Sequence, residues 1–129
     1  MLTQEPISIF TDDRGVRGSI VNTPSVSGTS ALPDLSAYNS SKHAVVIMTR
    51  VDARHFAPER IRVNSVCPGY VPTPMMTSAG FSEERFNLIK TLSSMQRIAY
   101  PEQVAETVYS YLVAGRRLSL GLIWLWMRV

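Results

Sequence analysis

The chain has 129 residues, enough for one ordinary domain, and its 45% hydrophobic content is typical of a packed globular chain. The net charge of +3 comes from three arginines within residues 116–129, Arg116, Arg117 and Arg128, so the body of the chain has no clustered basic face for a nucleic acid. One cysteine, Cys67, excludes an internal disulfide and fits a cytoplasmic location, and with two histidines it makes no recognisable metal site.

The first half of the chain predicts a strand and a long helix after an irregular lead-in over residues 1–17. The short apolar run at residues 20–21 predicts a buried strand that ends at a loop. A helix is expected over residues 37–56, with Ser36 as its N-cap. The segment is too long for a strand, and Pro58 follows its end.

The second half predicts another strand and two more helices. The stretch "IRVNSVC" reads as a short strand cut off by Pro68 and Gly69, and a proline-rich loop follows it. Ser82 can cap the next helix, and Pro101 opens the last one. The order strand, helix, strand, helix, helix predicts an α/β fold with a parallel sheet.

Tyr38 and Lys42 form the first candidate pair for chemistry. They stand four positions apart in the expected helix, so they share one helix face. A free phenol has a pKa near 10, and a cation within about 4–6 Å favours its ionised form, which makes the pair suitable for acid/base work. The alternative is an ordinary helix surface with a half-buried tyrosine and a solvated lysine.

Several motifs in register resemble the C-terminal half of a short-chain dehydrogenase/reductase. The stretch "SIVNTPS" resembles the family's strand before its catalytic serine, which aligns with Ser25, thirteen positions before Tyr38. "YNSSK" matches the family's Tyr-x-x-x-Lys, "IRVNSVCPGYVPTPM" resembles its next strand and Pro-Gly loop, and "RIAYPEQVAETV" resembles its later helix. The resemblance implies a partial Rossmann-like fold, a fragment of a doubly wound parallel sheet.

The resemblance also implies an oxidoreductase that transfers a hydride between NAD or NADP and a small-molecule carbonyl or alcohol substrate. In this family pattern Tyr38 transfers the proton, Ser25 binds and orients the substrate oxygen, and Lys42 supports the phenol and bonds the nicotinamide ribose. The implied cofactor-binding residues are Tyr38, Lys42, Pro68, Gly69, Val71 and Thr73.

The family pattern is missing at the N-terminal side. No glycine-rich turn for a cofactor pyrophosphate occurs, and the family's Asn-Asn-Ala-Gly stretch is absent. The family domain is therefore assigned to residues 18–115, and the chain is expected to be inactive alone. The alternative function is a non-enzymatic remnant or interaction protein. Such a protein would self-associate, or pair with a full-length relative, through the helix at 37–56.

Residues 116–129 depart from the family's final strand, which ends near Val-Asp-Gly-Gly. Their apolar run is too short to span a bilayer, although its Trp and Arg would suit a membrane surface. An out-of-frame reading of the family strand is the preferred interpretation. The last base of the Trp126 codon and the first two of the Met127 codon spell GAT, an aspartate codon, and neighbouring codons allow the rest.

Overall fold

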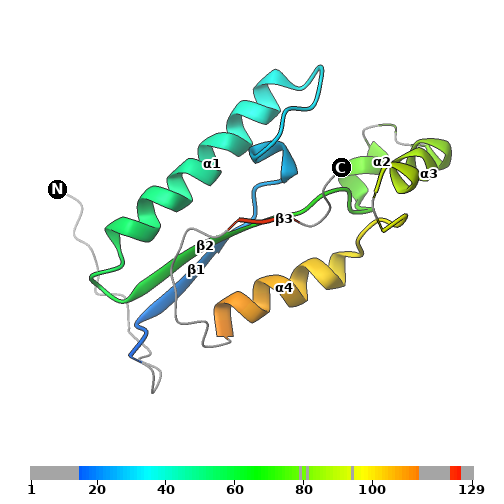
Figure 1. The fold of residues 1–129 in the computed structure, drawn as a ribbon. Coiled ribbons are helices and arrows are strands. Elements are labelled where there is room, and N and C mark those ends of the chain that lie inside the picture. The colour runs from blue at the N-terminus through cyan, green and yellow to red at the C-terminus, as the bar shows by residue number, and fades with distance from the viewer. Residues whose placement is uncertain (1–14, 79, 81, 94, 114–122, 126–129) are drawn as a thin grey trace.

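The computed structural model describes residues 15–78, 80, 82–93, 95–113 and 123–125, and these form three layers (Figure 1). The middle layer is a parallel sheet in the order β1-β2-β3, made of β1 (Gly18–Asn22), β2 (Ile61–Cys67) and β3 (Ile123–Leu125). One face of the sheet carries α1 (Ser36–His55), and the other carries α4 (Pro101–Val113). The predicted α/β class and parallel sheet are confirmed.

The strand β2 is the centre of the core because both of its faces are covered. Its residues from Arg62 to Cys67 are all buried, and Val63, Val66 and Cys67 are among the most completely buried side chains. The side chain of Arg62 donates a hydrogen bond to the carbonyl oxygen of Leu112 at the end of α4, over 3.4 Å. Burial on both faces is typical of a strand inside a parallel sheet.

The helix α1 packs on the sheet through Val46, Thr49 and Ala53, which are buried. The side-chain amide of Asn22, at the end of β1, donates to the Thr49 hydroxyl oxygen over 2.9 Å. That hydroxyl in turn donates to the Val45 carbonyl oxygen over 2.7 Å. The buried polar groups of α1 are thus paired, and they fix the helix against the carboxyl end of β1.

The start of α1 differs from the sequence prediction. Ser36 is the first helical residue rather than the N-cap, and the N-cap position belongs to Leu35, which makes no side-chain capping bond. The Leu35 carbonyl oxygen accepts the first helical hydrogen bond from the Asn39 N–H over 2.8 Å. The helix therefore begins one residue earlier than the expected 37–56 and ends at His55.

The second half adds two elements to the expected ones. The proline-rich segment contains the short helix α2 (Pro74–Ser78), and residues of the tail form β3 in parallel register with β2. The helix α3 (Glu83–Leu92) is capped as predicted, since the Ser82 hydroxyl oxygen accepts from the Arg85 N–H over 3.3 Å. Two strands were expected, and the described residues form three.

Residues 1–14 of the lead-in that was expected over residues 1–17, and most of the tail at 116–129, lie outside the described residues. In the part of the chain that the structure describes, no helix combines the length and apolar character needed to cross a bilayer.

Candidate active site

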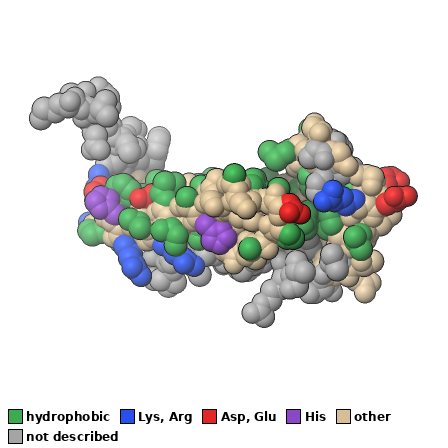
Figure 2. All heavy atoms as spheres, turned by 90° about the horizontal axis from the view of Figure 1, so that it is seen from above, with side chains coloured by type: hydrophobic (Ala, Val, Ile, Leu, Met, Phe, Trp, Pro, Cys, Tyr) green, Lys and Arg blue, Asp and Glu red, His purple; other side chains and the backbone are tan. Residues whose placement is uncertain are grey.

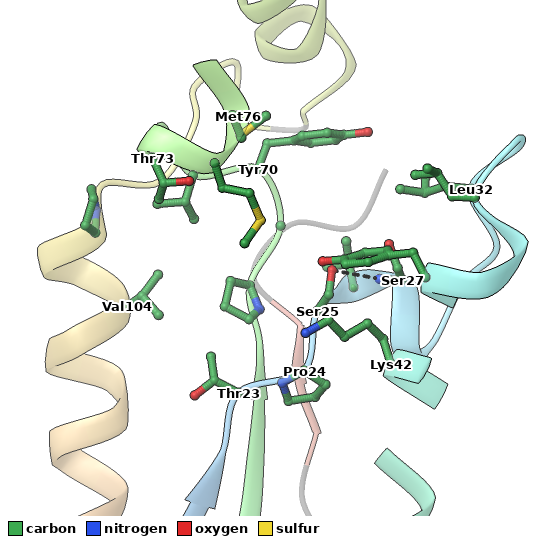
Figure 3. Close-up of a pocket in the computed structure, with 18 residues that line it drawn as sticks. Thr23, Pro24, Ser25, Ser27, Leu32, Lys42, Tyr70, Thr73, Met76 and Val104 are labelled. Atoms are coloured by element: carbon green, nitrogen blue, oxygen red, sulfur yellow. Dashed lines mark hydrogen bonds between the residues drawn. The ribbon is translucent and has the colours of Figure 1, made fainter. Parts of the chain in front are cut away.

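A cavity of about 620 Å³ opens where β1 and β2 end (Figure 3). Ligands of doubly wound folds bind beyond the carboxyl ends of the parallel strands, so the position is the expected one. The structure brings every sequence-predicted site residue to the wall of this cavity: Ser25, Tyr38, Lys42, Pro68, Gly69, Val71 and Thr73. Three separate segments supply them, namely the turn after β1, the first turns of α1 and the loop after β2.

Ser25 is held in place by the turn that follows it. It is the N-cap of a short 3₁₀ helix, η1 (Val26–Gly28), and its hydroxyl oxygen accepts a hydrogen bond from the Ser27 N–H over 3.2 Å. A hydroxyl that accepts on one side keeps its own proton free to donate. The preceding Pro24 also lines the cavity.

Tyr38 and Lys42 share one face of α1, as their spacing predicts. The Lys42 Nζ lies over the Tyr38 ring, 5.4 Å from its centre, within the range of a cation–π contact. Among the described residues, the structure records no hydrogen bond or ion pair for the Lys42 ammonium. Its three N–H donors are therefore open to a ligand in the cavity.

Cys67 lies at the end of β2, one residue before Pro68, and its side chain is fully buried. Burial raises the pKa of its thiol above the ordinary value of 9.0, and the Ser25 backbone, the Ser65 side chain and Arg50 oppose this effect only in part. A thiol that stays protonated is a poor nucleophile. Cys67 is thus a packing residue of the core at the end of β2.

The sequence did not identify the upper wall of the cavity. The loop before α1 and the segment after β2 provide apolar side chains there: Leu32, Leu35, Tyr70, Met75 and Met76. The Asn39 side chain fixes the first of these segments, because its amide donates to the Leu32 carbonyl over 2.7 Å and its oxygen accepts from the Leu32 N–H over 3.4 Å. The apolar residues in "YVPTPMM" were the sequence signal that could have indicated this apolar wall.

Comparison with known proteins assigns the family. The family described as enoyl-(acyl carrier protein) reductase matches residues 2–116 of the chain. A short-chain dehydrogenase of Neurospora crassa, srdC, is 44% identical over 112 residues, which are 84% of this chain and 41% of that protein. The chain belongs to the short-chain dehydrogenase/reductase family. It spans less than half the length of this relative.

Solved structures agree with this family assignment. A 3-hydroxyacyl-CoA dehydrogenase type-2 from Mycobacterium avium superposes with a TM-score of 0.78 at 27% identity, covering 90% of this chain and 44% of that one. A 4-hydroxyisoleucine dehydrogenase complexed with NADH superposes with a TM-score of 0.72 at 32% identity, covering 83% of this chain and 44% of that one. The fold is thus part of the Rossmann-like fold of these proteins.

Proposed function

We propose that this chain provides the proton-transfer and nicotinamide-binding part of an NAD(P)-dependent oxidoreductase that interconverts a carbonyl compound and an alcohol. The observation that carries the proposal is the convergence of Ser25, Tyr38 and Lys42 with the Pro68–Gly69 loop on one cavity. These residues come from segments far apart in the sequence. If Tyr38 and Lys42 were only an ordinary helix-surface pair, there would be no reason for Ser25 and the Pro68–Gly69 loop to lie around the same cavity.

The cavity suits the nicotinamide end of such a cofactor. Its volume of about 620 Å³ lies within the usual range for small-molecule sites, roughly 300–1,000 Å³. The open donors of the Lys42 ammonium match the hydroxyl oxygens of a ribose. Pro68, Gly69, Val71 and Thr73 would hold the nicotinamide, and NAD(P) would supply the hydride donor or acceptor when bound.

The residues of the chain then have distinct roles. The Tyr38 hydroxyl gives or takes the proton at the substrate oxygen. General acid/base catalysis of this kind typically accelerates a reaction about 10²–10⁴-fold. The Ser25 hydroxyl, whose oxygen accepts from Ser27, donates to the same oxygen and orients it. The Lys42 ammonium lies over the Tyr38 ring and would bond the hydroxyl oxygens of the nicotinamide ribose.

The 129-residue chain is expected to be inactive by itself. The proposed site residues would contact only the nicotinamide end of a dinucleotide, and the relative srdC is more than twice as long as the matched segment. Losing about 4 kcal/mol of cofactor contacts weakens binding about a thousandfold. A cytoplasmic location stays a prediction from the sequence.

A fusion tests the proposal. The segment of srdC that precedes its matched region is joined to this chain, and oxidation of NADH or NADPH is followed in the presence of a ketone. We expect turnover by the fusion and none by the chain alone. A fusion that folds and binds the cofactor but gives no turnover would contradict the proposed function.

A second candidate, a non-enzymatic interaction protein, is favoured by the outer face of α1. Ile47, Met48 and Val51 are each about half exposed or more, and Figure 2, which looks down on this helix, shows hydrophobic side chains along it. Such a face fits self-association or pairing with a full-length relative. The same fusion separates the two candidates, since a remnant would give no turnover in any assembly.

A further inference from the structure

The first turn of α1 carries Tyr38 but lacks the usual cap. The helix begins at Ser36, so Tyr38 is its third residue. The first N–H groups of a helix have no partner inside the helix, and a polar side chain at the N-cap normally binds one of them. Here the N-cap is Leu35, whose side chain makes no such bond. Helix ends fray, so Tyr38 needs another contact to hold this turn in place.

Asn39, the residue after Tyr38, ties the first turn to the loop before the helix. Its side-chain amide donates to the Leu32 carbonyl oxygen over 2.7 Å, and its side-chain oxygen accepts from the Leu32 N–H over 3.4 Å. Its backbone N–H donates to the Leu35 carbonyl oxygen over 2.8 Å. One residue thus binds both backbone polar groups of Leu32 and makes the first helical bond. We call the two side-chain bonds the Asn39 clasp.

The clasp closes a turn that is unfavourable by itself. The loop turns at Pro33 and Asp34, and Asp34 has a φ of 61°, in the left-handed region that favours glycine. A residue with a side chain keeps such a conformation where surrounding contacts hold it. The Asn39 clasp binds the residue just before this turn, and the Asn39 N–H binds the residue just after it. The loop and the first helical turn are therefore held as one unit.

We infer that Asn39 is a positioning residue for Tyr38: its side chain holds the uncapped first turn of α1 and so fixes the phenol at the substrate oxygen. The inference rests on the proposed function, because the position serves proton transfer by Tyr38. Ser25 stands before η1 and Lys42 in the second turn of α1, so neither is part of the clasp. Loss of the clasp should therefore impair proton transfer more than cofactor binding.

Three variants separate this role from plain helix stability. Asn39→Ala removes both side-chain bonds, although alanine favours a helix more than asparagine does. Asn39→Asp keeps an oxygen but loses the donor to the Leu32 carbonyl, although a negative charge suits the start of a helix. A residue that only stabilised the helix would tolerate both changes. Ser40→Ala is the matched control, because Ser40 is the next residue of α1, is exposed and lies outside the cavity wall.

Amide hydrogen exchange in the 129-residue chain measures the clasp without any turnover. The N–H at position 39 makes the first helical bond, so its exchange rate, followed by NMR, reports how often this turn opens. We expect it to exchange at least about fivefold faster in Asn39→Ala and Asn39→Asp, because a hydrogen-bonded clasp is lost. Ser40→Ala should keep the natural rate. Unchanged exchange in the second half of α1 shows that each variant is folded.

The fusion with the srdC segment gives the catalytic readout. A misplaced proton donor lowers kcat and kcat/KM together, whereas lost substrate binding raises KM. We expect both Asn39 variants to lower kcat at least about tenfold, since catalysis depends on near-attack geometry. The KM for the ketone and the dissociation constant of NADH or NADPH should stay within about twofold of the natural values. Ser40→Ala should keep the natural kcat.

The inference is overturned if position 39 exchanges at the natural rate in both Asn39 variants, or if their fusions keep the kcat of the Ser40→Ala fusion. It is also overturned if KM and the cofactor dissociation constant change as much as kcat, because that pattern indicates a general structural role. Failure of the proposed function has a different signature. An inactive fusion of the natural sequence would contradict the reaction, while the exchange rates decide separately whether Asn39 holds the first turn.

Discussion

The Val26 N–H donates a hydrogen bond to the Pro68 carbonyl oxygen over 2.9 Å, which joins the turn after β1 to the turn after β2. The first turn carries Ser25, and the second carries the Pro-Gly loop. One backbone bond thus fixes the distance between the residue assigned to the substrate oxygen and the loop assigned to the nicotinamide. Since catalysis depends on such positioning, we expect this bond to matter for turnover.

Val26→Pro removes the donor of this bond with little other change. Proline is favoured at the first position of a helix, and the extended backbone of Ser25, with φ 174° and ψ 164°, suits a residue before proline. Val26→Ala keeps the N–H and is the control. We expect the proline variant of the fusion to lose turnover well beyond the alanine variant, by about tenfold. Equal kcat values for the two variants would contradict this role.

Gly28→Ala should destabilise the chain. A Cβ at Gly28 would lie 2.7 Å from the Lys42 carbonyl oxygen and 2.8 Å from a Val46 methyl group, so η1 and α1 would have to separate. Overpacking of this kind costs about 1–3 kcal/mol in unfolding free energy.

The control for Gly28→Ala is Gly18→Ala, whose Cβ would meet Ile61 at an ordinary 3.7 Å. Urea unfolding followed by circular dichroism measures both variants. A loss in the Gly28 variant no larger than in the Gly18 variant would show that the close approach is not needed.

Cys67 should make stability fall at alkaline pH. Burial raises the pKa of its thiol in the folded state above the ordinary 9.0, so the unfolded chain releases this proton first as the pH rises. The thiol's contribution is fully present below the unfolded pKa and is lost above it. Urea unfolding between pH 7 and pH 10 should therefore show a steeper decline for the natural chain than for Cys67→Ala. Parallel curves would contradict the buried-thiol account.

The outer face of α1 should drive self-association. Replacing Ile47, Met48 and Val51 by glutamine removes exposed apolar surface without touching the residues that face the sheet. We expect the apparent mass in light scattering to fall toward the 14.4 kDa of one chain. Tyr109→Gln, at an exposed position of α4, is the control and should leave the mass unchanged. If the natural chain is already monomeric, this expectation is wrong.

Much of the fold was readable from the sequence because the local signals are strong. The β-branched run before Pro68 and the capping serine at Ser82 specified β2 and the start of α3. The strand β3 could not be predicted, since three residues carry no reliable pattern, and their pairing with β2 is a contact made at long range. The motif spacing predicted the candidate site residues Ser25, Tyr38 and Lys42. The apolar upper wall of the cavity could not be predicted, because it depends on how the loop before α1 and the segment after β2 lie together in the fold.

The central claim is that Tyr38 transfers the proton, and one variant tests it most directly. In the active fusion, Tyr38→Phe keeps the ring beneath the Lys42 ammonium and removes only the hydroxyl. We expect kcat to fall at least about 100-fold, with the dissociation constant of NADH or NADPH nearly unchanged. Lys42→Ala should impair both quantities, because the ammonium acts on the phenol and on the ribose. A Tyr38→Phe fusion that keeps full turnover would contradict this role of Tyr38. The "YNSSK" segment would then be an ordinary helix surface without a catalytic role.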